Sequence, residues 1–293
     1  FPFIFTWIGI SNIAPQGVVP DSVIYSFYIG AAILILCVIY TTVKVKEMPP
    51  AEYAEYHGIT EEEEKEKINM VKLLIKAPKA FWTVGLVQFF CWFAFMFMWT
   101  YTNGSVAANV FDAPTVETAV NGVSKVMLDT KSIQYQDAAD WVGVLFAVQA
   151  IGSVLWAVCI PLFKDRKLIY SLSLVLGGLG FISTYFVHNQ YVLFISFLLI
   201  GCAWAAMLAL PFTILTNALS GGHMGTYLGL FNGTICIPQI VAASLGGSIL
   251  ALFTPKGMLP PEINMLVMAG VMLIIGAVCV YLIKETKGEQ TKA

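Results

Sequence analysis

Charged side chains are scarce in this sequence. Asp, Glu, Lys and Arg make up 12% of the 293 residues and hydrophobic residues 58%, whereas soluble domains carry about twice that share of charge. A water-soluble fold cannot cover so much apolar surface, which excludes an ordinary soluble domain. The charges are also unevenly distributed, because no Asp, Glu, Lys or Arg occurs in five stretches, namely 22–43, 80–111, 141–163, 168–255 and 263–283.

These uncharged stretches predict membrane-spanning helices. Each is long enough to cross a bilayer, for which about 20 apolar residues suffice. The stretch 168–255 is too long for one helix, and polar breaks at 188–190 and 220–223 divide it into three. The predicted fold class is an all-α, multi-pass integral membrane protein, a bundle with about seven complete transmembrane helices.

The basic residues predict how these helices are oriented, because Lys and Arg concentrate in short cytoplasmic loops. If the segment after the first span is cytoplasmic, 13 of the 16 basic residues fall on that side, and the outer side keeps only Lys125, Lys131 and Lys256. We therefore expect a protein of the cytoplasmic (plasma or inner) membrane, with a cytoplasmic tail at 284–293.

The first ten residues form an apolar segment that is too short to span a membrane. The segment also lacks the basic flank of a signal peptide. We expect it to be the outer end of a preceding helix, joined to the first span by the turn-rich loop 11–21. An N-terminal portion is therefore expected to precede the sequence.

One sizeable polar segment, 44–80, separates the first span from the rest. Thr60 and Glu63 fit a helix-capping box, and apolar residues recur at helical spacing from Ile68 to Ile75. This pattern predicts a surface helix. Its lysines suit contact with anionic membrane lipid, which attracts each of them by about 1 kcal/mol. A solvated linker between two helix bundles explains the segment equally well.

Residues for enzymatic or metal chemistry are missing from the predicted spans. All three histidines lie outside them, no HExxH or CxxC spacing occurs, and no acidic or basic side chain lies inside one. We therefore expect no catalytic residue, no metal site, no cofactor and no nucleic-acid partner. A channel remains an alternative, although the sequence shows no evident re-entrant filter segment. A membrane-bound transferase is another, although its best candidate, the acidic loop 112–140, follows no catalytic or metal pattern.

Neutral polar and aromatic side chains recur instead at helical spacing. Gln88, Trp92, Phe95, Trp99 and Asn103 advance by four, three, four and four residues, which places all five on one helix face. Amides pair with hydroxyls, and an aromatic ring covers the apolar C–H face of a sugar ring, so this set predicts a neutral hydroxylated ligand such as a sugar. Residues on other spans complete the predicted binding set: Gln149, Trp204, Asn217, Asn232 and Gln239.

A structural role is the alternative for these residues. Asn and Gln also hydrogen-bond between helices, and Trp99 suits an aromatic belt at the membrane surface. For a single residue the two interpretations are equally good. For Gln88 together with Trp92, ligand contact is favoured, because polar groups in mid-membrane cost free energy unless something pairs with them.

A second pattern concerns helix movement. Glycines recur at intervals of four residues and predict a smooth groove along which another helix can slide or rock; they are Gly221, Gly225, Gly229 and Gly233. Pro238 is expected to interrupt the same helix, as cavity-lining prolines do in transporters, and Pro211 is expected to act likewise on the helix before it. Plain tight packing explains the glycines equally well.

Several runs resemble sugar transporters of the major facilitator superfamily, in the sucrose and maltose (glycoside-pentoside-hexuronide:cation) symporter-like branch. MGTYLGLFNGTICIPQI at 224–240 resembles helix 11 of that family, and PFTILTNAL at 211–219 resembles the end of helix 10. QFFCWFAF at 88–95 resembles helix 7, and KEMPP at 46–50 resembles the entry to the central loop.

The resemblance implies that the seven spans are helices 6 to 12 of a twelve-helix transporter. Segment 1–43 is then the end of helix 5 with helix 6, 44–80 the central cytoplasmic loop and 81–283 the C-terminal six-helix half. It also implies sugar transport by alternating access, driven by a proton or sodium ion whose carboxylate lies in the N-terminal half. A facilitative uniporter or a channel-like pore is the alternative. The sequence departs from the family at 164–167, where KDRK lacks the glycine of the usual basic loop.

Overall fold

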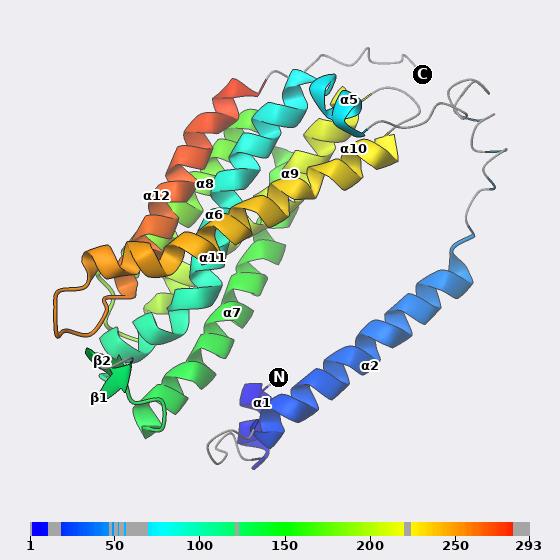
Figure 1. Ribbon diagram of the computed structural model, residues 1–293. Helices are drawn as coiled ribbons and strands as arrows, with labels where there is room; N and C mark the ends of the chain where they lie inside the picture. The colour runs from blue at the N-terminus through cyan, green and yellow to red at the C-terminus, as the bar shows by residue number, and fades with distance from the viewer. Residues whose placement is uncertain are drawn as a thin grey trace. The chain divides into compact units, whose positions relative to one another are not determined.

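The computed structural model describes residues 2–10, 19–46, 49, 52, 56, 70–120, 123–219 and 224–283. The chain divides into two compact units, Phe1–Asn69 and Met70–Ala293. Within the described residues, seven helices are long and apolar enough to cross a membrane (Figure 1). This count confirms the predicted all-α membrane fold.

The first unit contains α1 (Pro2–Trp7) and the long α2 (Asp21–Lys44). An acidic residue begins α2 and a basic residue ends it, which suits the two ends of the helix dipole. The hydroxyls of Ser26, Thr41 and Thr42 donate to carbonyls four residues earlier, at 2.6–2.9 Å. These polar groups are therefore paired inside the helix, as an apolar environment requires.

The second unit is a helix bundle with one short hairpin. Its elements in chain order are α5 (Met70–Ile75), α6 (Lys79–Asn109), β1 (Thr115–Val120), β2 (Val123–Leu128), α7 (Ile133–Cys159), η1 (Ile160–Leu162), α8 (Arg166–Ser183), α9 (Leu193–Ala218), α10 (Met224–Phe231), α11 (Gly233–Phe253), α12 (Ile263–Cys279) and η2 (Val280–Leu282). The strands β1 and β2 pair antiparallel, with Val116 opposite Met127. Of the predicted surface helix only α5 is described; Thr60 and Glu63 lie outside the described residues.

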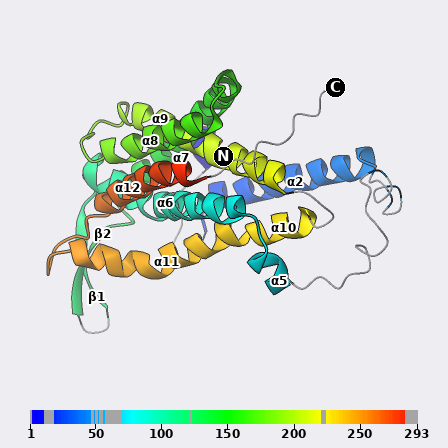
Figure 2. The ribbon, with the colours of Figure 1, turned by 90° about the horizontal axis from the view of Figure 1, so that it is seen from above.

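Helix α6 forms the centre of this bundle. Its most apolar stretch is 67% buried, more than that of any other span. It packs against α12, α11, α7 and α9, while α8 packs against α9 and α12. Seen from above, α11 lies on the opposite side of α6 from α8 (Figure 2). The α6 face that carries Trp92, Phe95 and Trp99 contacts Trp204 of α9.

Glycines set the close helix contacts around α6. A Cβ atom on Gly178 of α8 would lie 2.9 Å from the Gly270 carbonyl of α12. A Cβ on Gly201 of α9 would lie 2.8 Å from the Ser153 backbone nitrogen of α7. Small residues let membrane helices approach this closely and gain van der Waals contact.

Two helix boundaries differ from the sequence prediction. Helix α7 begins at Ile133, eight residues before the predicted start, because the Ser132 hydroxyl accepts from the Tyr135 backbone N–H and caps the helix there. The acidic residues Asp137 and Asp140 lie inside the helix, so a search for uncharged stretches starts it too late.

The interruption predicted at Pro238 lies instead at Asn232, between α10 and α11. Pro238 is buried inside a continuous α11. The Asn232 carbonyl accepts from the Ile235 N–H at 3.0 Å and from the Cys236 N–H at 3.1 Å, so the hydrogen bonds of α11 begin at this residue. The helix is therefore not interrupted at Pro238 itself, and a role of this proline in gating stays a prediction.

Candidate functional site

Three tryptophans from two helices form one aromatic cluster. Trp92 and Trp99 of α6 lie 6.3 Å apart between ring centroids, and Trp204 of α9 lies 5.9 Å from each of them. Phe95 adds a fourth ring, 4.9 Å from Trp204. Trp204 meets both indoles of α6 edge-on, at interplanar angles of 77° and 78°, the geometry that aromatic pairs favour. We refer to these four residues as the tryptophan cluster.

Exposure differs across the tryptophan cluster. Trp92 is only 8% exposed, whereas Trp99 is 44% exposed and Trp204 is partly buried. The cluster therefore runs from the packed interior of the bundle to an accessible surface. Trp99 is more exposed than Trp92 and marks the accessible end of the cluster.

Gln88 lies at the buried end of the same α6 face. Its side chain is 1% exposed, and its Nε2 donates to the Met207 carbonyl of α9 at 3.0 Å. That carbonyl has no helical partner, because the residue four positions later is Pro211, which carries no N–H. Gln88 thus pairs a carbonyl that the proline leaves free.

Unpaired polar atoms also lie on this face. Four buried side-chain N or O atoms have no hydrogen-bond partner among the described residues, and three of them belong to α6: Gln88 Oε1, Trp92 Nε1 and Asn103 Oδ1. The fourth is the Tyr170 hydroxyl on α8. A buried, unpaired polar group costs about 1–3 kcal/mol. Two acceptors and one donor in this position match what a hydroxylated ligand offers.

The other four predicted binding residues come from α7, the end of α9, the α10–α11 junction and α11. Gln149 is buried on α7 close to Gly201 of α9, within a helix contact. Asn217 is exposed near the end of α9, Asn232 is exposed between α10 and α11, and Gln239 is partly buried on α11. The structure gathers the α6 residues and Trp204 in one cluster, and the binding role of these four residues stays a prediction.

The glycine groove of α10 and α11 has no neighbour in this conformation. No described heavy atom lies within 4 Å of a Cβ built on Gly225 or Gly229, and only Ile237 of the same helix approaches Gly233, at 3.9 Å. Gly221 lies outside the described residues. The role of this groove stays a prediction.

Two glycines that the spacing pattern missed mark where α11 crosses α6. A Cβ on Gly85 of α6 would lie 3.0 Å from Thr234 Cγ2, and a Cβ on Gly246 of α11 would lie 2.6 Å from the Tyr101 hydroxyl. Isolated glycines carry no periodic signal, so only the packed structure identifies them.

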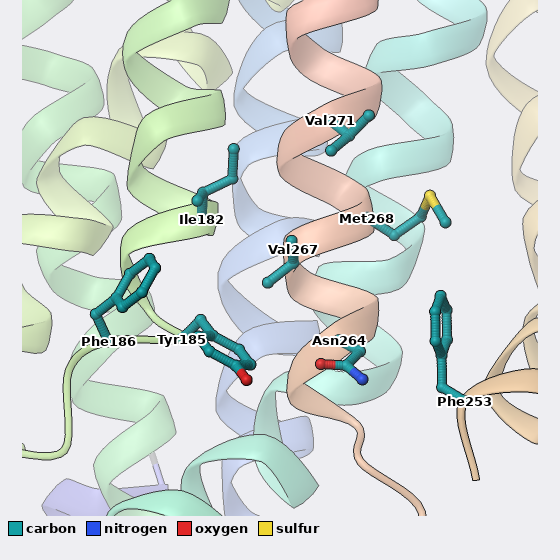
Figure 3. A pocket seen from close by; sticks show the side chains of 8 residues that line it. All are labelled: Ile182, Tyr185, Phe186, Phe253, Asn264, Val267, Met268 and Val271. Carbon is teal, nitrogen blue, oxygen red and sulfur yellow. The ribbon is translucent and has the colours of Figure 1, made fainter.

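A cavity of about 510 Å³ lies away from this face, between α8, α12 and the end of α11 (Figure 3). Its lining is apolar apart from Tyr185 and Asn264, which lie at one end of it. It contains none of the predicted binding residues. The cavity is therefore not the predicted ligand site.

A bundle of membrane-capable helices, with neutral polar and aromatic groups gathered on the central helix, has the architecture of a polytopic membrane transporter. Residues 106–293 match the family model of the Major Facilitator Superfamily. The chain belongs to this family, and membership points to a transporter rather than an enzyme. Searches of curated proteins and of solved structures found no match.

Proposed function

We propose that the protein is a secondary active transporter that moves a mono- or disaccharide across the cytoplasmic membrane by alternating access, coupled to a proton or sodium ion. The observation that carries this proposal is the tryptophan cluster beside the unpaired polar atoms of Gln88, Trp92 and Asn103. Aromatic and neutral polar groups are the two kinds of contact that a sugar ring needs.

The chemistry of the cluster argues for a neutral ligand. The apolar C–H face of a pyranose ring packs on an indole, and its hydroxyls donate to amide oxygens such as Gln88 Oε1. The only charged residue of α6 is Lys79, at its first position, so a charged ligand would find no counter-ion on this helix beside the tryptophan cluster. Each hydrogen bond to a neutral ligand contributes about 0.5–1.5 kcal/mol, and several of them with stacking give a binding site of moderate affinity.

The contact between α6 and α11 supports the alternating-access part of the proposal. Gly85 and Gly246 let the two helices cross at close range, and contacts between small residues permit sliding with little side-chain rearrangement. Pro211 adds a weak point to α9, since its turn lacks one backbone hydrogen bond. Gly85 and Pro211 lie on α6 and α9, the two helices that carry the tryptophan cluster.

Uptake of labelled maltose, sucrose and hexoses tests the proposal, measured in vesicles that contain the full-length protein with and without an imposed proton or sodium gradient. Accumulation that follows one gradient supports a symporter and identifies its ion. Saturable equilibration without accumulation favours a uniporter, and non-saturable flux favours a channel-like pore. Absence of uptake for every sugar would overturn the assignment of the ligand class.

A further inference from the structure

A single carboxyl group is packed against the predicted outer end of α6. Glu262 is the last residue of the connection between α11 and α12, one position before α12 begins. A Cβ built on Gly104 of α6 would lie 2.5 Å from the Glu262 carboxyl carbon and 2.9 Å from its Oε1. The carboxyl group therefore occupies the space that the missing side chain of Gly104 leaves.

No opposite charge compensates this carboxylate. Among the described residues Glu262 forms no ion pair or side-chain hydrogen bond, and it makes no capping bond to the first turn of α12. The titratable group that faces it from α6 is Tyr101. Lys256 lies in the same connection but does not pair with it, and α11 and α12 carry no acidic or basic residue.

The surroundings of Glu262 favour its neutral form. Burial raises the pKa of its carboxyl from 4.5 to about 7, because a low-dielectric environment disfavours the charged form. The positive end of the α12 dipole opposes this effect and is the weaker of the two, since it acts here without a hydrogen bond. A small neighbouring space is lined by neutral residues, including Ser105, Asn109 and Thr184.

We propose that Glu262 is a proton-binding site and that its protonated side chain holds the outer ends of α6 and α12 together (Figure 1). Loss of the proton drives the carboxylate away from Gly104 into water and loosens this contact. In the transport cycle, protons on the outer side would then favour a closed outer end of the bundle. This part of the inference rests on the proposed function. The proton site itself requires no sugar.

Infrared difference spectroscopy of the full-length protein in lipid nanodiscs, titrated from about pH 5 to about pH 9, tests the site. The wild type is expected to lose a protonated-carboxyl C=O band with a midpoint near pH 7, and Glu262→Gln is expected to lack that component. Asp112→Asn is the matched control. Asp112 is exposed, and its φ of 47° is one that Asn tolerates, so this variant should keep the band.

A second variant approaches the site from the opposite helix. Gly104→Ala places a methyl group where the carboxyl lies, so the midpoint should move down from about pH 7 toward the ordinary value of 4.5. Gly143→Ala on α7 has no atom within 4 Å of the added Cβ and should leave the midpoint unchanged.

A band that persists in Glu262→Gln, or an unchanged midpoint in folded Gly104→Ala, would overturn the inference. If Gly104→Ala does not fold, the comparison of wild type with Glu262→Gln decides alone. Because no sugar is present, a failed uptake experiment and a failed titration are independent results.

Discussion

The Gln88 side chain donates its amide hydrogen to the Met207 carbonyl at 3.0 Å, and Pro211 is the reason that this carbonyl is free. The bond ties the central helix α6 to the one turn of α9 that lacks its own hydrogen bond. This hydrogen bond also accounts for the burial of the Gln88 side chain when no ligand is bound. The donor end of Gln88 serves the fold, and its Oε1 stays unpaired at the end of the tryptophan cluster.

This relationship predicts a measurable coupling between Gln88 and Pro211. Gln88→Leu alone should destabilise the protein by about 1–3 kcal/mol, because it leaves the buried Met207 carbonyl unpaired. In the Pro211→Ala background the new N–H can bond to that carbonyl, so the same substitution should cost at least about 1 kcal/mol less. Thermal unfolding of the wild type, the two single variants and the double variant in detergent measures the difference. Strictly additive effects would show that the bond contributes nothing.

The tryptophan cluster predicts which substitutions weaken uptake. Trp92→Ala and Trp204→Ala should each raise the KM by about tenfold, since an aromatic contact of about 1.4 kcal/mol corresponds to that factor. Expression should be retained, as it should in Gln88→Ala, which is also expected to reduce uptake. Trp82→Ala is the control, because Trp82 lies on α6 outside the cluster and is 52% exposed. Normal kinetics in both cluster variants would remove these residues from the ligand site.

The sequence predicts local features of this protein better than contacts between its helices. The span count and the α6 face follow from charge and periodicity along one segment, and both need only the helical repeat. The partner of Gln88 lies 119 positions away, and no spacing within α6 indicates it.

Contacts between helices also decide which glycines matter in this conformation. Gly225 and Gly229 form a periodic pattern but face open space, whereas isolated Gly85 and Gly246 lie at a helix crossing. Glu262 escaped the sequence prediction for a related reason, because it lies one residue outside an uncharged stretch and only the packing of α12 on α6 buries it. Charge patterns identify where spans end, and packing decides which end residues are removed from water.

The crossing of α6 and α11 predicts a paired rescue. Gly246→Ala should lower the melting temperature, because its Cβ would lie 2.6 Å from the Tyr101 hydroxyl. Tyr101→Phe removes that oxygen, and the nearest remaining atoms then lie at 3.4–3.5 Å, an ordinary contact. The double variant should therefore recover most of the lost stability. If Tyr101→Phe raises the melting temperature of the Gly246→Ala protein by no more than it raises that of the wild type, the proposed contact is contradicted.

The open glycines of α10 predict the opposite result. Gly229→Ala should be neutral or stabilise the protein by up to about 1 kcal/mol, because alanine favours the helix more than glycine does and the added Cβ meets no atom. Thermal unfolding measures the stability, and sugar uptake measures the function. Loss of uptake at unchanged stability would indicate that another helix uses the groove in a different state of the cycle.

Glu262 predicts how stability depends on pH. Because the pKa of its carboxyl rises from 4.5 to about 7 on folding, the folded protein holds the proton more tightly than the unfolded chain. Stability is therefore fully present below about pH 4.5, falls as the pH rises toward 7 and changes no further above it, a total loss of about 3 kcal/mol. Glu262→Gln cannot ionise, so its melting temperature should lack this fall, while Asp112→Asn should retain it. Parallel pH profiles for wild type and Glu262→Gln would show that the carboxyl is hydrated in the folded protein.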